Sequence, residues 1–150
     1  MCLILLSCNA HPRYRLILAA NRDEFHHRPT APLAFWEDRP DILAGRDVRG
    51  GGTWLGITRT GRFSALTNFR EPDSLGERAL SRGLLVRGFL ESRQSPVDYL
   101  ADLEIEGNRY DGFNLLVGDS RGLYCYSNRE GHIRKLSPGI HGPRSLSDLG

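Results

Sequence analysis

Residues 1–24 read MCLILLSCNAHPRYRLILAANRDE, and this stretch decides the fold. Two short apolar runs, residues 2–8 and 15–20, flank a turn-like segment at residues 9–13 that contains Asn9 and Pro12. Apolar runs of this length, separated by turn-forming residues, are typical of an antiparallel β-hairpin. We therefore expect the chain to begin with two paired strands.

The next part of the chain is rich in residues that interrupt regular structure. Residues 24–52 contain Pro29, Pro32 and Pro40 and end in the triplet Gly50-Gly51-Gly52. Proline and glycine favour turns and loops over regular elements. This stretch is predicted to be mostly loop, with one short strand around Ile42-Leu43.

Beyond residue 52 the pattern alternates between strand and helix signals. A second hairpin is predicted because two β-rich runs are joined by Thr60-Gly61. Capping residues and apolar spacing predict two helices, and three further strands are separated by turn sequences. The predicted elements are strands at 53–58 and 62–68, helices at about 75–92 and 95–107, and strands at 112–118, 123–127 and 132–136.

The order of strands, two helices and more strands predicts an α+β fold. In such a fold a helix pair covers one face of an antiparallel sheet, and the other sheet face still needs a partner. A chain of 150 residues is long enough for one core. We expect a single domain over residues 1–150.

Composition limits the partners and the compartment. A net charge of +2 without a basic cluster gives no indication of nucleic-acid binding. The apolar run after Met1 is too short for a signal peptide or a membrane span, which predicts a cytoplasmic protein. Three cysteines, an odd number, argue against a disulfide framework.

Cys2 follows Met1 directly, and this position suggests a specific chemistry. We hypothesise that an aminopeptidase removes Met1, which would leave Cys2 with both a thiol and a free α-amine. A terminal amine titrates near pH 8, so it can accept the thiol proton at neutral pH. Cys2 is therefore a candidate N-terminal nucleophile, although a plain buried strand remains the alternative.

The predicted hairpin surrounds Cys2 with polar residues. A turn near residue 11 pairs residues whose numbers sum to about 23, which places Cys2 beside Asn21 and puts Asp23 on the same face. A slip of one residue brings Arg22 there instead. Asp23 is a candidate to hold the amine, Arg22 to stabilise a thiolate or bind a substrate carboxylate, and Asn21 or Asn68 to stabilise an oxyanion.

Other motifs have simpler explanations. The histidines at 11, 26 and 27 lack the spacing of a zinc site, and we expect no metal. The glycine triplet lacks the lysine and helix start of a phosphate loop. Cys8 and Cys125 are expected to fill the core. Trp54 is a candidate for either a pocket wall or core packing.

The motifs of the chain resemble those of a known family. The motifs are similar to those of the NRDE family, which is named for its Asn-Arg-Asp-Glu tetrapeptide and includes the transport and Golgi organisation protein 2 homologues. The matching segments run from residue 1 to about residue 142. They are Met1-Cys2, residues 20–25, residues 28–30, Gly45-Arg46-Asp47, residues 51–56, residues 67–70, residues 112–116 and residues 139–142.

The resemblance implies a fold and an activity. It implies an N-terminal nucleophile hydrolase-like αββα sandwich and cleavage of a non-peptide amide bond in a small molecule, with no cofactor. Cys2 then matches the nucleophile, and Arg22 and Asp23 resemble the residues that accompany it. Asn68 or Asn114 corresponds to an oxyanion-hole asparagine. Asn114, Trp54 and Arg70 are the candidate substrate-binding residues.

The resemblance also supplies an alternative function. Family members have been connected with haem mobilisation, lipid metabolism and secretory-pathway organisation, so the partner is a small-molecule amide, haem or an acyl lipid. In the alternative the same cleft binds haem or an acyl lipid without chemistry. The sequence departs from the family pattern after Gly142 and stops short of its usual length. We expect an incomplete sandwich with an uncovered apolar sheet face.

Overall fold

A computed structural model describes residues 3–22, 27–69 and 80–142 of the chain. The described parts form strands, two α-helices and one short 3-10 helix. In chain order they are β1 (Leu3–Cys8), β2 (Leu16–Asn21), β3 (Thr30–Phe35), β4 (Ile42–Asp47), β5 (Leu55–Thr58), β6 (Phe63–Asn68), α1 (Gly83–Glu91), α2 (Pro96–Glu106), η2 (Gly107–Arg109), β7 (Phe113–Asp119), β8 (Gly122–Ser127), β9 (Ile133–Lys135) and β10 (Gly139–His141).

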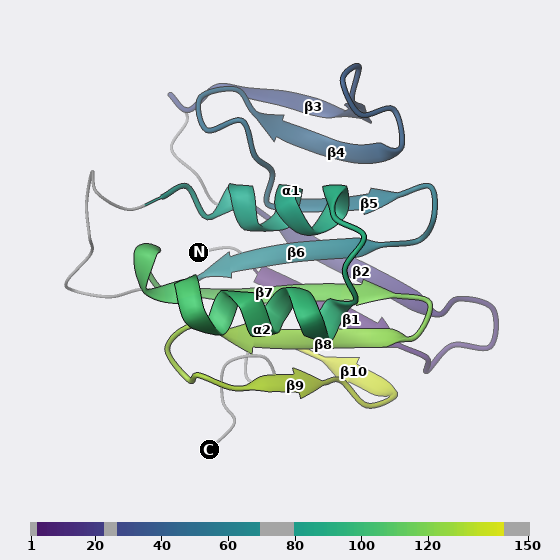
Figure 1. Cartoon of the computed structure of the whole chain (residues 1–150). Coiled ribbons are helices and arrows are strands. Elements are labelled where there is room, and N and C mark those ends of the chain that lie inside the picture. The colour runs from purple at the N-terminus through teal and green to yellow at the C-terminus, as the bar shows by residue number, and fades with distance from the viewer. Residues whose placement is uncertain (1–2, 23–26, 70–79, 143–150) are drawn as a thin grey trace.

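The strands form two antiparallel sheets. The larger sheet has seven strands in the order β3-β4-β5-β6-β7-β8-β9, and the smaller has three in the order β10-β1-β2. Figure 1 shows both helices in front of the larger sheet and the smaller sheet behind it. The predicted α+β class and the predicted hairpin of β1 and β2 are therefore confirmed.

One apolar core lies between the helices and the larger sheet. The buried residues of α1, among them Leu85 and Phe89, keep the spacing of one helix face. They pack against Leu115 and Val117 of β7, which are fully buried. Because β7 is covered on both faces, its sequence is apolar almost throughout rather than alternating.

A second core lies between the two sheets. Alternate residues of β1, namely Ile4, Leu6 and Cys8, are buried against Leu116 of β7 and Cys125 of β8. Both cysteines fill the core as predicted. Burial raises the pKa of the Cys125 thiol to about 11, so this thiol stays protonated at neutral pH.

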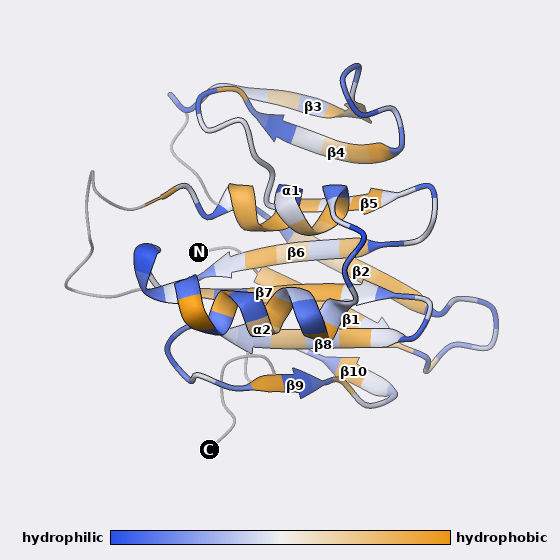
Figure 2. Cartoon of the chain, viewed as in Figure 1, coloured by the Kyte–Doolittle hydropathy of each residue, from blue (hydrophilic) through white to orange (hydrophobic). Residues whose placement is uncertain are grey.

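The outer face of the smaller sheet carries exposed apolar side chains. Leu3, Leu5 and Ile17 are 40%, 45% and 43% exposed, and Ile140 of β10 is 81% exposed. The strands of both sheets are largely orange or white in Figure 2, while the turns between them are mostly blue. The expected uncovered apolar face is present within the described parts of the chain.

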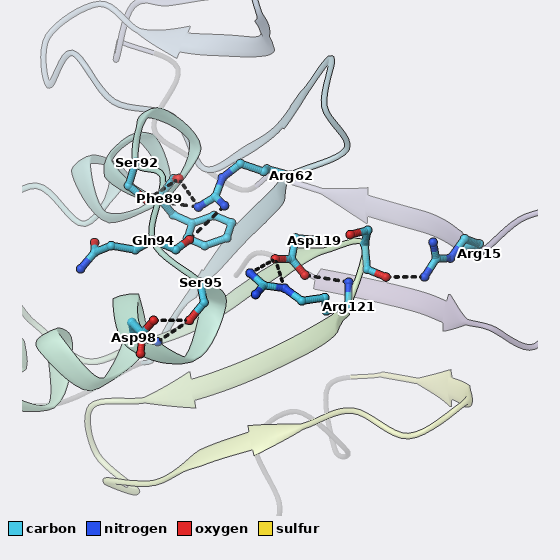
Figure 3. Close-up of polar contacts among 10 residues, drawn as sticks. Arg15, Arg62, Phe89, Ser92, Gln94, Ser95, Asp98, Asp119 and Arg121 are labelled. Atoms are coloured by element: carbon cyan, nitrogen blue, oxygen red, sulfur yellow. Dashed lines mark hydrogen bonds and ion pairs between the residues drawn. The ribbon is translucent and has the colours of Figure 1, made fainter.

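The second helix begins where the sequence predicts. Ser95 accepts a hydrogen bond from the Asp98 amide at 3.1 Å, and Pro96 occupies the first helical position. Figure 3 shows this cap at the N-terminal end of α2. The first helix starts later than predicted, at Gly83, and residues 75–79 of the predicted range lie outside the described residues.

Arg62, beside the turn between β5 and β6, fastens the end of α1 to the larger sheet. Its guanidinium donates to the carbonyls of Phe89 and Gln94, both at 3.0 Å, and to the Ser92 hydroxyl at 3.1 Å (Figure 3). The guanidinium also lies over the Phe89 ring, 4.0 Å from its centroid. One of the last carbonyls of α1, that of Phe89, is thus bonded from the sheet.

Two strands were absent from the sequence-based prediction. β3 lies within the stretch predicted as loop, and all of its residues are exposed. It is an edge strand with an irregular register between Ala31 and Ala34, which accommodates Pro32. The short β10 pairs with β1 and extends the smaller sheet. Neither strand has the apolar alternation on which a prediction depends.

Within the described parts of the chain, neither helix is long and apolar enough to cross a membrane.

Candidate functional site

The register of the first hairpin decides which polar residues face the interior. Leu3 pairs with Asn21 and Ile4 with Ala20, so paired residue numbers sum to 24 rather than about 23. Asn21 therefore lies opposite Leu3 on the outer face, not beside Cys2 as the first expected register requires. Cys2 and Asp23 lie outside the described residues. The structure has the second register, the one that favours Arg22.

A large cleft opens at the end of the molecule where β1 begins. Its volume is about 580 Å³. Cys8, at the end of β1, shares a different pocket with Phe63 at the start of β6. The beginning of β1 therefore lies toward the end of β6, on the left of Figure 1. Arg22, which follows β2, and Asn68, the last residue of β6, both line the cleft.

Several motifs that are distant in the sequence converge on this cleft. The lining includes Arg28 and Thr30 from one family motif, residues 45–47 from another, and Thr53 and Trp54 from a third. Half of the remaining lining residues come from the segment before α1 and from its first residue. They are Ala31, Arg49, Leu66, Leu80, Ser81, Arg82, Gly83 and Asp111.

The glycine triplet shapes one wall of the cleft by close backbone packing. A Cβ atom on Gly52 would lie 2.4 Å from the carbonyl carbon of Gly83, the first residue of α1. The Thr53 amide donates to the Gly83 carbonyl at 3.2 Å. Gly51 has a φ of +70°, in the region that favours glycine. The triplet therefore allows α1 to pack closely against this loop, as the turn expected from the sequence requires.

Arg28 and Asp47 form an ion pair in the wall of the cleft. Nε and Nη2 of Arg28 donate to the same Asp47 oxygen at 3.0 and 2.6 Å. The other Asp47 oxygen accepts from the amides of Arg49 and Gly50, both at 3.1 Å. Burial raises the pKa of the Asp47 carboxyl, but these hydrogen bonds lower it further, and the net pKa lies below its ordinary value.

The cleft carries an excess of positive charge. The described lining residues include five arginines and two aspartates, which leaves a formal charge of +3. Arg46 is held by Asp38 through two hydrogen bonds of 2.6 and 2.9 Å, and it stacks on Trp36. Arg82 donates to the Gly112 carbonyl at 2.8 Å. These fixed guanidinium groups favour a negatively charged ligand.

Asn114 lies in the layer between the sheets rather than in the cleft wall. It is paired with Thr67 of β6 and with Ser127 of β8, so three polar residues form a row across the inner face of the larger sheet. Its Nδ2 donates to the Thr67 hydroxyl at 3.3 Å. Its buried Oδ1 has no hydrogen-bond partner among the described residues. This row lies toward the same end as the cleft.

The structure thus brings together some of the predicted site residues. Arg22, Trp54 and Asn68 line the cleft, whereas Asn21 and Asn114 do not. Arg70, like Cys2 and Asp23, lies outside the described residues. Sequence reasoning assigned no role to several cleft residues, although some stand in motifs that it singled out. These unassigned residues are Arg28, Asp47, Arg49 and Arg82.

The described residues contain no group of three or more His, Cys, Asp and Glu side chains that could hold a metal ion.

Comparison with known proteins identifies the family. A family model described as "Transport and Golgi organisation 2" matches residues 1–146. Relatives named transport and Golgi organization protein 2 homolog from Bos taurus and Homo sapiens are each 41% identical over 95% of this chain, and the match covers 56% of their own length. Transport and Golgi organization protein 2 of Drosophila melanogaster is 33% identical over 77% of the chain and is covered for 45%. The chain spans about half the length of these curated relatives. It belongs to the transport and Golgi organisation 2 family.

Proposed function

We propose that this protein is an N-terminal cysteine hydrolase that cleaves a non-peptide amide bond of a small molecule, with Cys2 as the nucleophile after removal of Met1. The observation that carries the proposal is the register of β1 and β2. If the same register continued by one residue beyond Leu3 and Asn21, position 2 would lie opposite Arg22, which lines the cleft. Because side chains alternate along β1, a strand continued to position 2 would place that side chain on the same face as Ile4 and Leu6.

Arg22 is suited to activate this nucleophile. A guanidinium near a thiol favours the thiolate and lowers the pKa of the cysteine. The α-amine of Cys2 accepts the thiol proton, and the thiolate attacks the carbonyl carbon of the amide. The proton passes to the leaving amine as the C–N bond breaks, and water then hydrolyses the thioester. Asp23 holds the α-amine in this scheme.

An oxyanion formed in the attack needs a hydrogen-bond donor. Asn68 lies at the end of β6 and lines the cleft, and this position supports Asn68 as the hydrogen-bond donor to the oxyanion. Asn114 is a positioning residue in this scheme, since its Nδ2 is bonded to Thr67 and its side chain lies between the sheets. Trp54 and Leu66 supply the apolar wall for the rest of the substrate.

The fold assignment belongs to the same proposal. The helix pair, the seven-stranded sheet and the three-stranded sheet agree with three successive layers of an αββα sandwich, the architecture of N-terminal nucleophile hydrolases. The exposed apolar face of the smaller sheet is where a fourth layer would pack. A reactive thiol of this kind is also consistent with a reducing, cytoplasmic location.

Binding of haem or an acyl lipid in the same cleft is the competing function. Its support is the combination of arginines with Trp54, Leu66 and Leu80, because both ligands join an apolar body to acidic groups. This function requires neither the removal of Met1 nor the Cys2 thiol. The two functions therefore differ in their dependence on Cys2.

The deciding experiment uses the complete protein and compares Cys2→Ala with Cys8→Ala. Cys8 is a matched control because it is a second cysteine of the same chain and is buried at the end of β1. Turnover of a panel of small amides should be lost in Cys2→Ala and kept in Cys8→Ala, and intact mass should show that Met1 is absent. Retention of Met1 in active protein, or full turnover by Cys2→Ala, would contradict the hydrolase. Saturable haem or acyl-lipid binding without turnover would support the competing function.

A further inference from the structure

The segment between α2 and β7, residues 107–112, forms part of the cleft wall and links other parts of it. Asp111 of this segment lines the cleft. The carbonyl of the next residue, Gly112, accepts a hydrogen bond from the Phe69 amide at 2.9 Å and another from the Arg82 guanidinium at 2.8 Å. One carbonyl therefore connects the chain that follows β6 with the segment that precedes α1.

These links reach the proposed oxyanion donor, Asn68. Phe69 follows Asn68 directly, and Asn68 lies opposite Phe113 in the pairing of β6 with β7. Figure 1 shows that α2 and β6 both end on the left, so the 107–112 segment lies at the same end of the molecule as the cleft. A shift of this segment would therefore displace Asn68 and the Arg82 side of the cleft together.

Asn128, the first residue after β8, holds this segment from outside the cleft. Its Nδ2 donates to the Gly107 carbonyl at 2.9 Å and, at 3.4 Å each, to the carbonyls of Tyr110 and Asp111. Its Oδ1 accepts from the Phe113 amide at 2.9 Å. One side chain thus binds both ends of the segment and the start of β7.

The contacts of Asn128 require an asparagine. Its side chain combines a donor and an acceptor on a short stem, and each faces a group of the complementary kind. A Cβ atom on Gly107 would lie 3.2 Å from the Asn128 Cβ, so the two residues pack closely. Aspartate has the same shape, but it would direct a negative oxygen at carbonyl oxygens in place of the donor.

We propose that Asn128 is a positioning residue for the cleft, which fixes Asn68 and the Arg82 side of the wall without contacting the ligand. Asn128 is not among the described residues that line the cleft. Its effect on catalysis rests on the proposed hydrolysis. Because Asn68 is the proposed donor to the oxyanion, a loss of its position should lower kcat far more than it changes KM.

The link from Asn128 to the cleft can be measured without turnover. Hydrogen exchange followed by NMR reports on the Phe69 amide, whose acceptor is the Gly112 carbonyl. In Asn128→Ala and Asn128→Asp this amide should exchange about tenfold faster, as expected when the segment loses a stabilising hydrogen bond. Asn128→Ser keeps one hydroxyl donor, replaces either variant that does not fold, and should show a smaller change in the same direction.

Ser95→Ala is the matched control, because it removes a side-chain hydrogen bond at the opposite end of α2. It should leave exchange at Phe69 unchanged, and circular dichroism checks that each variant is folded. Wild-type exchange at Phe69 in Asn128→Asp would overturn the proposal. Equal acceleration of this exchange by Ser95→Ala and Asn128→Asp would also overturn it, because the effect would then be one of general stability.

Kinetics of the complete protein supply the second readout. Asn128→Asp should lower kcat about tenfold, less than the hundredfold or more expected when an oxyanion donor is deleted, and should change KM less than about twofold. Ser95→Ala should leave both constants unchanged. A wild-type kcat in Asn128→Asp, or a fall in activity that lies entirely in KM, would contradict the positioning of Asn68.

The two readouts separate this inference from the proposed function. If Cys2→Ala keeps full turnover while Asn128→Asp accelerates exchange at Phe69 and lowers kcat, the positioning role stands and the nucleophile assignment fails. If Cys2→Ala abolishes turnover but Asn128→Asp has wild-type exchange and kcat, the positioning role fails and the hydrolase stands.

Discussion

The pockets at the two ends of the molecule differ in chemistry, although β6 contributes residues to both. At the end where β1 begins, the cleft of about 580 Å³ is lined by five described arginines, and the polar residues Thr67, Asn114 and Ser127 lie nearby. At the other end a pocket of about 310 Å³ has a mostly apolar surface, from residues such as Leu16, Phe63 and Leu123, and among its described lining residues Arg15 is the one arginine.

Strand alternation alone therefore does not determine where a polar site forms. The inner face of β7 carries Asn114 at one end and Leu116 two residues later, and both are buried. Apolar packing stabilises the second end, whereas the first end keeps an unpaired polar atom that costs stability. Residues retained at such a cost are typical of a functional site.

The largest expected effect compares these two neighbours directly. Leu116→Ala removes buried apolar atoms and should lower the free energy of unfolding by about 3 kcal/mol. Asn114→Ala should cost less than about 1 kcal/mol, because it gives up one long hydrogen bond and removes an unsatisfied oxygen. Urea unfolding of both variants checks this. Equal destabilisation by the two substitutions would mean that the two ends are packed alike.

The next comparison uses one glycine from each end. Gly52→Ala brings a Cβ atom into the backbone of Gly83 at the cleft, and it should cost about 2 kcal/mol and weaken ligand binding. Gly61, in the turn at the other end, has a φ of +81° but open space around it. Gly61→Ala should cost about 1 kcal/mol, through backbone strain alone. Ligand binding that responds equally to both variants would contradict the account.

A smaller effect on stability is expected at Arg62, which binds the end of α1 from beside the turn between β5 and β6. Arg62→Gln removes charged hydrogen bonds to the Phe89 and Gln94 carbonyls and should lower the free energy of unfolding by about 1.5 kcal/mol. Ligand binding in the cleft should persist, because Arg62 is not among the described residues that line it. The exposed Arg93→Gln is the control for stability and should change it by less than about 0.5 kcal/mol.

The smallest effect concerns the Asp47 carboxylate. Its folded-state pKa lies below the ordinary value of 3.8, so the ionised form contributes stability at neutral pH. This contribution is fully present above the unfolded-state pKa and is lost as the pH falls through the lower folded-state pKa. The stability advantage over Asp47→Asn should therefore be constant above pH 5 or so and shrink below about pH 4. An advantage that grows on acidification would contradict this ionisation.

Much of the fold was predictable because local signals and tertiary packing agree. The hairpin of β5 and β6, the cap at Ser95 and the strands β7 to β9 lie close to their predicted ranges. β3 was not predicted, since an exposed edge strand with Pro32 has neither buried alternation nor uninterrupted hydrogen bonding. β10 was not predicted because three residues are too few for a periodic pattern.

The site was predictable only in part. The sequence drew attention to the region of Arg22, Trp54 and Asn68, and these three do line one cleft. The sequence left two registers of the first hairpin possible, which differ by one residue. In the register that the structure has, Asn21 lies on the outer face. Arg28, Asp47 and Arg49 were not assigned because their roles arise from ion pairs and loop contacts across the fold, which spacing along the chain does not reveal.

The most direct test of the central claim measures the reactivity of the three cysteines in one sample. The complete protein is pulsed with iodoacetamide at several pH values, and mass spectrometry follows alkylation at Cys2, with the buried Cys8 and Cys125 as internal references. We predict a chain without Met1, fast alkylation at Cys2 with a midpoint below the usual thiol pKa of about 8.5, and a higher midpoint in Arg22→Gln. Retention of Met1, or the same midpoint with and without Arg22, would contradict it.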